Sequence, residues 1–163
     1  MTNYYCLVTG LPDLSLDDGK LNYTVANFKT ELYPQLSKED KKLIDLFYLK
    51  FDNENLLKLL KDKEAVIDAS LENYSVDELL SVINSFKEEL PPDKKFPSYF
   101  YQFAALYLDS SEEERIGIED QLYGYYYDYA MSSSNAFVSS WYELNLNVNN
   151  ILSALSARKY KMD

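Results

Sequence analysis

Residues 51–63 read FDNENLLKLLKDK, and the interpretation of this stretch decides the fold. Asp52, Asn53 and Asn55 stand directly before an LLKLL run that has the spacing of one helix face. A metal loop, an ordinary helix start and a repeated structural unit all account for such a pattern. An EF-hand loop needs glycine at its sixth position and glutamate at its twelfth, where this stretch has Leu57 and Lys63. We therefore expect no metal site here.

The helix-start interpretation rests on the capping chemistry of Asp and Asn. At the start of a helix, the side-chain oxygen of such a residue accepts a backbone N–H two or three residues further along. Asn55 can both donate and accept, so it can tie the helix start to the preceding segment. The sequence thus predicts that a capped helix begins at Asp52, after a separate helix over residues 43–51.

A related stretch, LNVNNILSALSAR, occupies residues 146–158. An offset of 95 residues, the difference between positions 147 and 52, aligns the two stretches without a gap. The duplicated unit predicted from this alignment is a helix, a short break and a capped helix. The aligned motif residues are Asp52, Asn55 and Lys63 in the first stretch and Asn147, Asn150 and Arg158 in the second.

The composition of the 163-residue chain excludes several classes of function. Its formal net charge of -11 disfavours nucleic-acid binding, which needs clustered Lys and Arg. The absence of histidine removes the commonest general base and the commonest metal ligand. No apolar run approaches the roughly 20 residues that cross a bilayer, so we expect no direct membrane insertion. The single cysteine and the lack of a signal-peptide pattern favour a cytoplasmic protein.

Helical spacing covers nearly the whole chain, which predicts an all-α fold with about seven helices. Only residues 4–9 could form a strand, and their apolar run does not distinguish strand from helix. The segment EELPPDKK at 88–95 is the best linker candidate. It separates a first helical unit, 1–90, from a second, 91–163, and we expect the two to pack as one compact body.

Local signals place the ends of individual helices. One helix is predicted over residues 20–33, where Pro34 stops it. The remaining signals are capping patterns at Ser37–Asp40 and Ser75–Glu78, Pro97 in a first turn, a start with acidic residues at Ser110–Glu114, and a break over Ser132–Asn135.

A tyrosine-rich segment follows residue 122. Stacking on nucleic-acid bases is usually accompanied by cations, whereas this segment contains Asp128. Packing between neighbouring helices and a protein interface are the two remaining interpretations. The candidate interface residues are Tyr123, Tyr125, Tyr126, Tyr127 and Tyr129.

The sequence offers little for catalysis. A hydrolase could use carboxylates such as Asp17, Asp18 or those of Glu112–Glu114, but adjacent acids on a helix point in different directions. Acidic first turns are also ordinary capping chemistry. No nucleophile elbow, Cys-His pair or phosphate loop is present. We expect no catalytic residue and no cofactor.

The stretches LKFDNENLLKLLKDK and LNLNVNNILSALSARK resemble a signature of the V/A-type ATPase central-stalk subunit, called C in archaeal-type and d in eukaryotic enzymes. The N-terminal stretch YYCLVTGLPDLSLDDGK and the whole first half look more closely like an uncharacterised bacterial family whose genes are associated with V-type ATPase genes. The stalk subunit has three such units. This sequence offers one complete unit and the start of another, as a truncated chain or a shorter relative would.

The resemblance implies a funnel of pseudo-repeated helical units that catalyses nothing itself. In the ATPase, such a subunit links the rotor axle to the membrane ring of ion-carrying subunits and transmits torque. The implied partners are therefore other V/A-type ATPase subunits, and the implied location is the cytoplasm, peripheral to the inner membrane through those partners. A general helical scaffold with a tyrosine-rich interface is the alternative. The motif residues at 52, 55, 63, 147, 150 and 158 are expected to be architectural.

Overall fold

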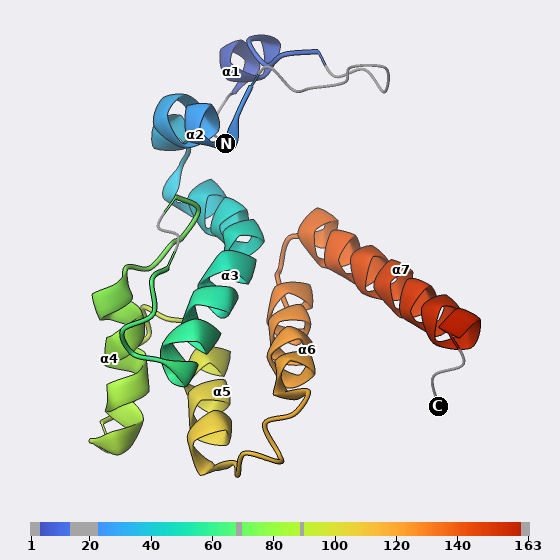
Figure 1. Cartoon of the computed structure of the whole chain (residues 1–163). Helices are drawn as coiled ribbons and strands as arrows, with labels where there is room; N and C mark the ends of the chain where they lie inside the picture. Colours follow the sequence, from blue (N-terminus) through green and yellow to red (C-terminus); the bar gives the residue numbers. More distant parts are fainter. Residues whose placement is uncertain (1–3, 14–22, 68–69, 89, 161–163) are drawn as a thin grey trace. The chain divides into compact units, whose positions relative to one another are not determined.

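The computed structural model describes residues 4–13, 23–67, 70–88 and 90–160, which form seven α-helices and no strand (Figure 1). The all-α prediction is thus confirmed for the described part of the chain. The chain divides into two compact units, residues 1–47 and 48–163. The division falls within the long helix α3 (Lys38–Lys61).

The first unit is made of short helical segments. Its start settles the choice left open at residues 4–9, because Tyr5–Thr9 form helix α1. The helix predicted over 20–33 is helical from residue 25 onwards but in three pieces, and residues 20–22 lie outside the described residues. The pieces are α2 (Val25–Asn27), the π-helical turn η1 (Phe28–Leu32) and the 3-10 turn η2 (Tyr33–Gln35), which contains Pro34.

Hydrogen bonds around Tyr4 fix the beginning of α3. The Tyr4 hydroxyl accepts the backbone N–H of Ser37 at 2.7 Å and donates to Asp40 Oδ2 at 2.6 Å. Ser37 Oγ accepts the N–H of Asp40 at 3.1 Å, so the predicted cap at Ser37 is confirmed. The hydrogen bonds from Tyr4 and Ser37 lower the pKa of Asp40.

The second unit contains the core. Helices α4 (Val76–Lys87), α5 (Ser98–Asp109), α6 (Ile118–Met131) and α7 (Ala136–Tyr160) follow the last turns of α3. Each packs against the next along the chain: α4 on α5, α5 on α6 and α6 on α7. The apolar side chains that are at most 1% exposed are Leu56, Leu59, Leu79, Val82, Ile83, Phe100, Phe103, Ala104 and Ala130.

Several predicted helix ends are confirmed in this unit. Ser75 and Glu78 form a reciprocal capping box at the start of α4. Helix α5 begins at Ser98, so Pro97 is its N-cap and lies one residue before the first turn in which it was predicted. Asn135 Oδ1 accepts the N–H of Val138 at 3.1 Å and so caps α7 after the predicted break.

Three predicted starts are wrong. Helix α3 runs without a break through Asp52, and α7 runs without a break through Asn147, so neither residue caps a helix. Ser111 and Glu114 do exchange capping hydrogen bonds, but they enclose only a turn. Helix α6 begins at Ile118, because Gly117 adopts a left-handed backbone, with φ of 77°, that a helix cannot continue.

The boundary expected at residues 90 and 91 separates α4 from α5, two helices that pack on each other. The proline-containing segment that joins them is not helical in its described residues, as its composition indicates. The division into 1–90 and 91–163 stays a prediction.

Candidate functional site

The carboxylate of Asp52 is the most buried charged group among the described residues, with no exposed surface. Its Oδ1 accepts the backbone N–H groups of Asn73 at 2.9 Å and Tyr74 at 3.1 Å. Its Oδ2 accepts the side-chain amide of Asn73 at 2.9 Å. Asp52 therefore joins the middle of α3 to the segment that leads into α4.

The pKa of Asp52 reflects two opposing effects. Burial raises it to about 6, while the hydrogen bonds from Asn73 and Tyr74 lower it, because they favour the charged form. The neighbouring charge of Glu72 adds a smaller upward contribution. The three donors, together with the nearby N-terminus of α4, stabilise the charged form of this buried carboxylate.

Asn53 is the second buried polar residue of this site, and its place in the polar run before the leucines predicted no role for it. Its Oδ1 accepts the hydroxyl of Tyr99, on α5, at 2.7 Å. Its Nδ2 is buried without a hydrogen-bond partner in the described part of the chain. Burial raises the pKa of Tyr99 well above its ordinary value. Asp52 and Asn53 thus connect α3 to α4 and α5 through adjacent positions.

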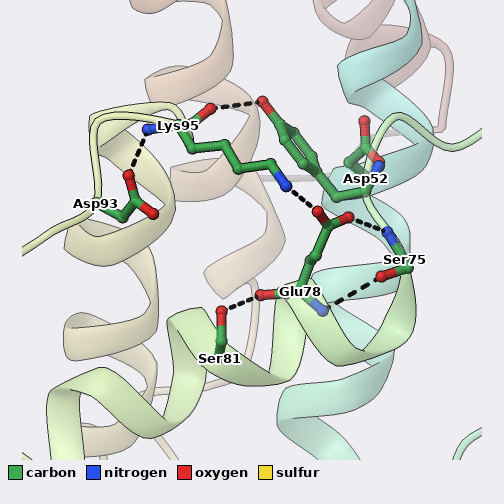
Figure 2. Close-up of polar contacts among 7 residues, drawn as sticks. Asp52, Ser75, Glu78, Ser81, Asp93 and Lys95 are labelled. Atoms are coloured by element: carbon green, nitrogen blue, oxygen red, sulfur yellow. Dashed lines mark hydrogen bonds and ion pairs between the residues drawn. The ribbon is translucent and has the colours of Figure 1, made fainter.

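A surface network continues from Asp52 toward the segment before α5. Figure 2 shows Lys95 reaching Glu78, which in turn is hydrogen-bonded to Ser75 at the start of α4. The Tyr74 hydroxyl donates to the backbone carbonyl of Lys95 at 3.2 Å. Asp93 Oδ1 accepts the N–H of Lys95 at 2.9 Å. These contacts hold the 90–97 segment against the beginning of α4.

The other two motif residues of the first stretch also lie within this part of the fold. Asn55 is buried, with 3% of its surface exposed. Lys63 lies just beyond the end of α3 and donates to Asn84 Oδ1, on α4, at 3.1 Å. All three residues of the first motif therefore lie where α3 meets α4 or the core.

The second motif has a different environment. Asn147, Asn150 and Arg158 all lie inside α7 and are exposed. The alignment predicts that Asn55 and Asn150 occupy equivalent positions, each near the start of a helix. Neither residue lies near a helix start, so this part of the prediction is wrong. Both lie inside long helices, but one is buried and the other faces outward. The two stretches share a helical conformation and differ in what covers them.

A shallow cavity of about 230 Å³ lies between α3 and α6. A salt bridge of 2.9 Å joins Lys61 to Glu119 at this cavity. Charges of both signs are balanced in the lining, which gives no preference for a cation or an anion. The lining residues are Asn53, Glu54, Leu57, Lys58, Lys61, Glu119, Leu122 and Tyr123.

The tyrosines of α6 divide between core and surface. Tyr126 is buried, and its hydroxyl lies 2.8 Å from that of Tyr142, on α7. Tyr127 accepts a hydrogen bond of 2.9 Å from Asn149 Nδ2. Tyr125 and Tyr127 are half-buried, whereas Tyr123 and Tyr129 are 42% and 37% exposed. The middle of the segment thus packs between helices, and its role as a protein interface stays a prediction.

The proposed catalytic carboxylates are not brought together in the described residues. Asp17 and Asp18 lie outside them. Glu112 and Glu113 are exposed, and hydrogen bonds from Ser111 lower the pKa of Glu114. No group of three or more Cys, Asp or Glu side chains that could hold a metal ion occurs among the described residues. Nor is any described helix long and apolar enough to span a bilayer.

The comparisons with known proteins give the family of the chain. No curated protein and no solved structure shows a significant match to it. Residues 1–163 match the model of the family described as "Protein of unknown function (DUF2764)", and the chain therefore belongs to that family.

Proposed function

We propose that this chain is a non-catalytic, stalk-like or accessory subunit of a bacterial V/A-type ATPase, which works by holding other proteins through helical surfaces. The observation that carries the proposal is the burial of two residues of the first motif, Asp52 and Asn55, inside α3. Asp52 is fully buried and accepts three hydrogen bonds from Asn73 and Tyr74, so it joins α3 to the segment that leads into α4. Architectural use of these residues is what the resemblance to the stalk subunit implies.

The character of the described surface is compatible with a protein-binding role. Large apolar side chains are exposed along α7, including Phe137, Ile151 and Leu155. Exposed apolar surface of this kind marks contact sites for proteins more often than sites for small polar substrates. The formal net charge of -11 also favours partners with basic surfaces.

Co-purification from the native bacterium tests the proposal. The tagged chain, expressed at its natural level, is recovered from detergent-solubilised membranes and its partners are identified by mass spectrometry. We expect subunits of the rotor axle or the membrane ring to be enriched over a tagged, unrelated acidic protein. Repeated recovery of the chain without any ATPase subunit would contradict the proposal.

The tyrosine-rich scaffold is the second candidate, and the exposure of Tyr123 and Tyr129 favours it. Replacing both residues by serine removes the exposed rings and leaves the buried Tyr126 in place. Under this alternative, the variant loses a partner that is not an ATPase subunit. If the double variant retains every partner of the original chain, the tyrosine interface is excluded.

A further inference from the structure

Helix α7 carries a continuous apolar stripe, which we call the α7 stripe. Its members are separated alternately by four and three residues, and each is between 44% and 71% exposed. Such exposure is unusual for so many large apolar side chains on one helix. The members are Phe137, Trp141, Leu144, Val148, Ile151 and Leu155.

The spacing of the α7 stripe points to a helix as its partner. Apolar residues repeated every 3.5 positions form a straight seam when two helices wind around each other, with each side chain fitting between four of the facing helix. A helix packed on an irregular surface has no need of so strict a period. The pattern lasts about three heptads, which is near the lower limit for a stable coiled coil.

Another face of α7 already has its contacts within the chain. Val138 and Tyr142 are buried, and Tyr142 is hydrogen-bonded to Tyr126 of α6. Ser139 Oγ donates to the carbonyl of Met131, at the end of α6, at 2.8 Å. These contacts fix the first turns of α7 and leave the α7 stripe uncovered by α6.

The area of the α7 stripe suits a reversible pair. A half-exposed large apolar side chain offers on the order of 100 Å², so the six members offer roughly 600 Å². Two copies together would bury about 1,200 Å², the lower end of the range for specific interfaces. The exposed Leu152 borders the stripe and adds to this area.

Charge favours a second copy of the same chain as the occupant. The chain as a whole carries -11, so most of its surface repels another copy. Helix α7 departs from this, since Glu143 is its only acid and Arg158 and Lys159 are basic. The positions that flank the stripe include Asn145 and Asn147, which are uncharged, so these positions add no like-charge repulsion between two α7 helices.

We propose that two copies of this chain pair through the α7 stripe, seam against seam. The pairing does not depend on any association with an ATPase. It also places Asn147, which aligns with Asp52 in the second motif, beside the contact between the two chains. An exposed amide there can donate and accept hydrogen bonds across the seam.

Sedimentation equilibrium of the full chain tests the pairing. Over roughly a hundredfold range of concentration, we expect the average mass of the wild-type chain to rise from 19.0 kDa toward twice that value. Ile151→Asp places a charge in the middle of the stripe and should weaken association at least tenfold. Leu144→Asp should do the same one heptad earlier. Both side chains are exposed in the single chain, so folding, followed by circular dichroism, should be unchanged.

Ser156→Asp is the matched control, because it adds the same charge to an exposed position of α7 off the stripe. We expect this variant to associate like the wild type. A wild-type chain that remains at 19.0 kDa at every concentration overturns the proposal. So does equal association of the wild type and both stripe variants. A third result also overturns it: the wild type is a monomer that co-purifies with another protein, and Ile151→Asp, but not Ser156→Asp, abolishes that co-purification. The stripe would then bind that protein and not a second copy.

Discussion

Helices α3 and α7 are the two longest in the chain and carry the same motif, yet they lie in opposite environments. At the 95-residue offset, Leu49 aligns with Leu144 and Leu56 with Ile151. Leu49 and Leu56 are at most 3% exposed, whereas Leu144 and Ile151 are 57% and 60% exposed. A sequence pattern that builds a core in one helix therefore produces a surface in the other. The pattern specifies which face is apolar, and the neighbouring elements decide whether that face is covered.

The largest expected effect compares Leu56→Ala with Ile151→Ala. Removing the Leu56 side chain opens a cavity in the core, which should lower the free energy of unfolding by about 2–5 kcal/mol. Ile151→Ala removes an exposed side chain and should change it by less than about 0.5 kcal/mol in the monomer. Chemical denaturation at low protein concentration measures both values. Similar losses for the two variants would mean that α7 is covered within the chain.

A second prediction concerns pH and Asp52. Because burial raises its pKa to about 6, the folded state binds a proton more tightly than the unfolded state, where the ordinary value of 3.8 applies. The contribution of Asp52 to stability is therefore full below about pH 4 and declines as the pH rises through about 6. The total change is up to about 3 kcal/mol.

Asp52→Asn provides the reference, since asparagine does not titrate. Between pH 4 and pH 8, the free energy of unfolding of the wild type should fall relative to that of the variant. The difference in the free energy of unfolding between Asn147→Asp and the wild type should change little over this pH range, because position 147 is exposed. A pH-independent difference for Asp52→Asn would show that the carboxylate is not desolvated.

The smallest effect concerns the fixed end of α7. Tyr142→Phe removes one partner of the hydroxyl pair with Tyr126 and should cost about 1 kcal/mol in unfolding free energy. Asn149→Ala removes the more exposed hydrogen bond to Tyr127 and should cost less. Thermal denaturation of the two variants ranks them. The reverse order would indicate that α7 is held chiefly by its middle.

Local chemistry predicted much of the fold. The caps at Ser37 and Ser75 each act within three residues, so their signals are complete in the sequence. The start assigned to Asp52 was wrong for a different reason. The groups that satisfy its carboxylate belong to Asn73 and Tyr74, 21 and 22 residues away, and such partners outweigh the modest helix propensity of aspartate.

The candidate site was predicted in part. Asp52 and Asn55 were assigned to the motif and are buried, whereas Asn53 was given no role and is buried as well. Its signal was present, because residues 49, 52, 53 and 56 share one face of a continuous helix. The predicted helix start at Asp52 assigned residues 49 and 53 to different helices, so their common face was not recognised. The burial of the first motif and the exposure of the second could not be predicted, since both depend on which segments fold back over each helix.

The chain has a single tryptophan, Trp141, and it stands in the α7 stripe with 44% of its surface exposed. Its ring stacks on Phe137 at a centroid distance of 6.3 Å. Indole emission shifts to shorter wavelength when water leaves the ring, so the fluorescence spectrum responds to whatever covers this helix. Raising the concentration of the unlabelled chain, or adding a partner to it, would give a fluorescence signal that originates at this one surface.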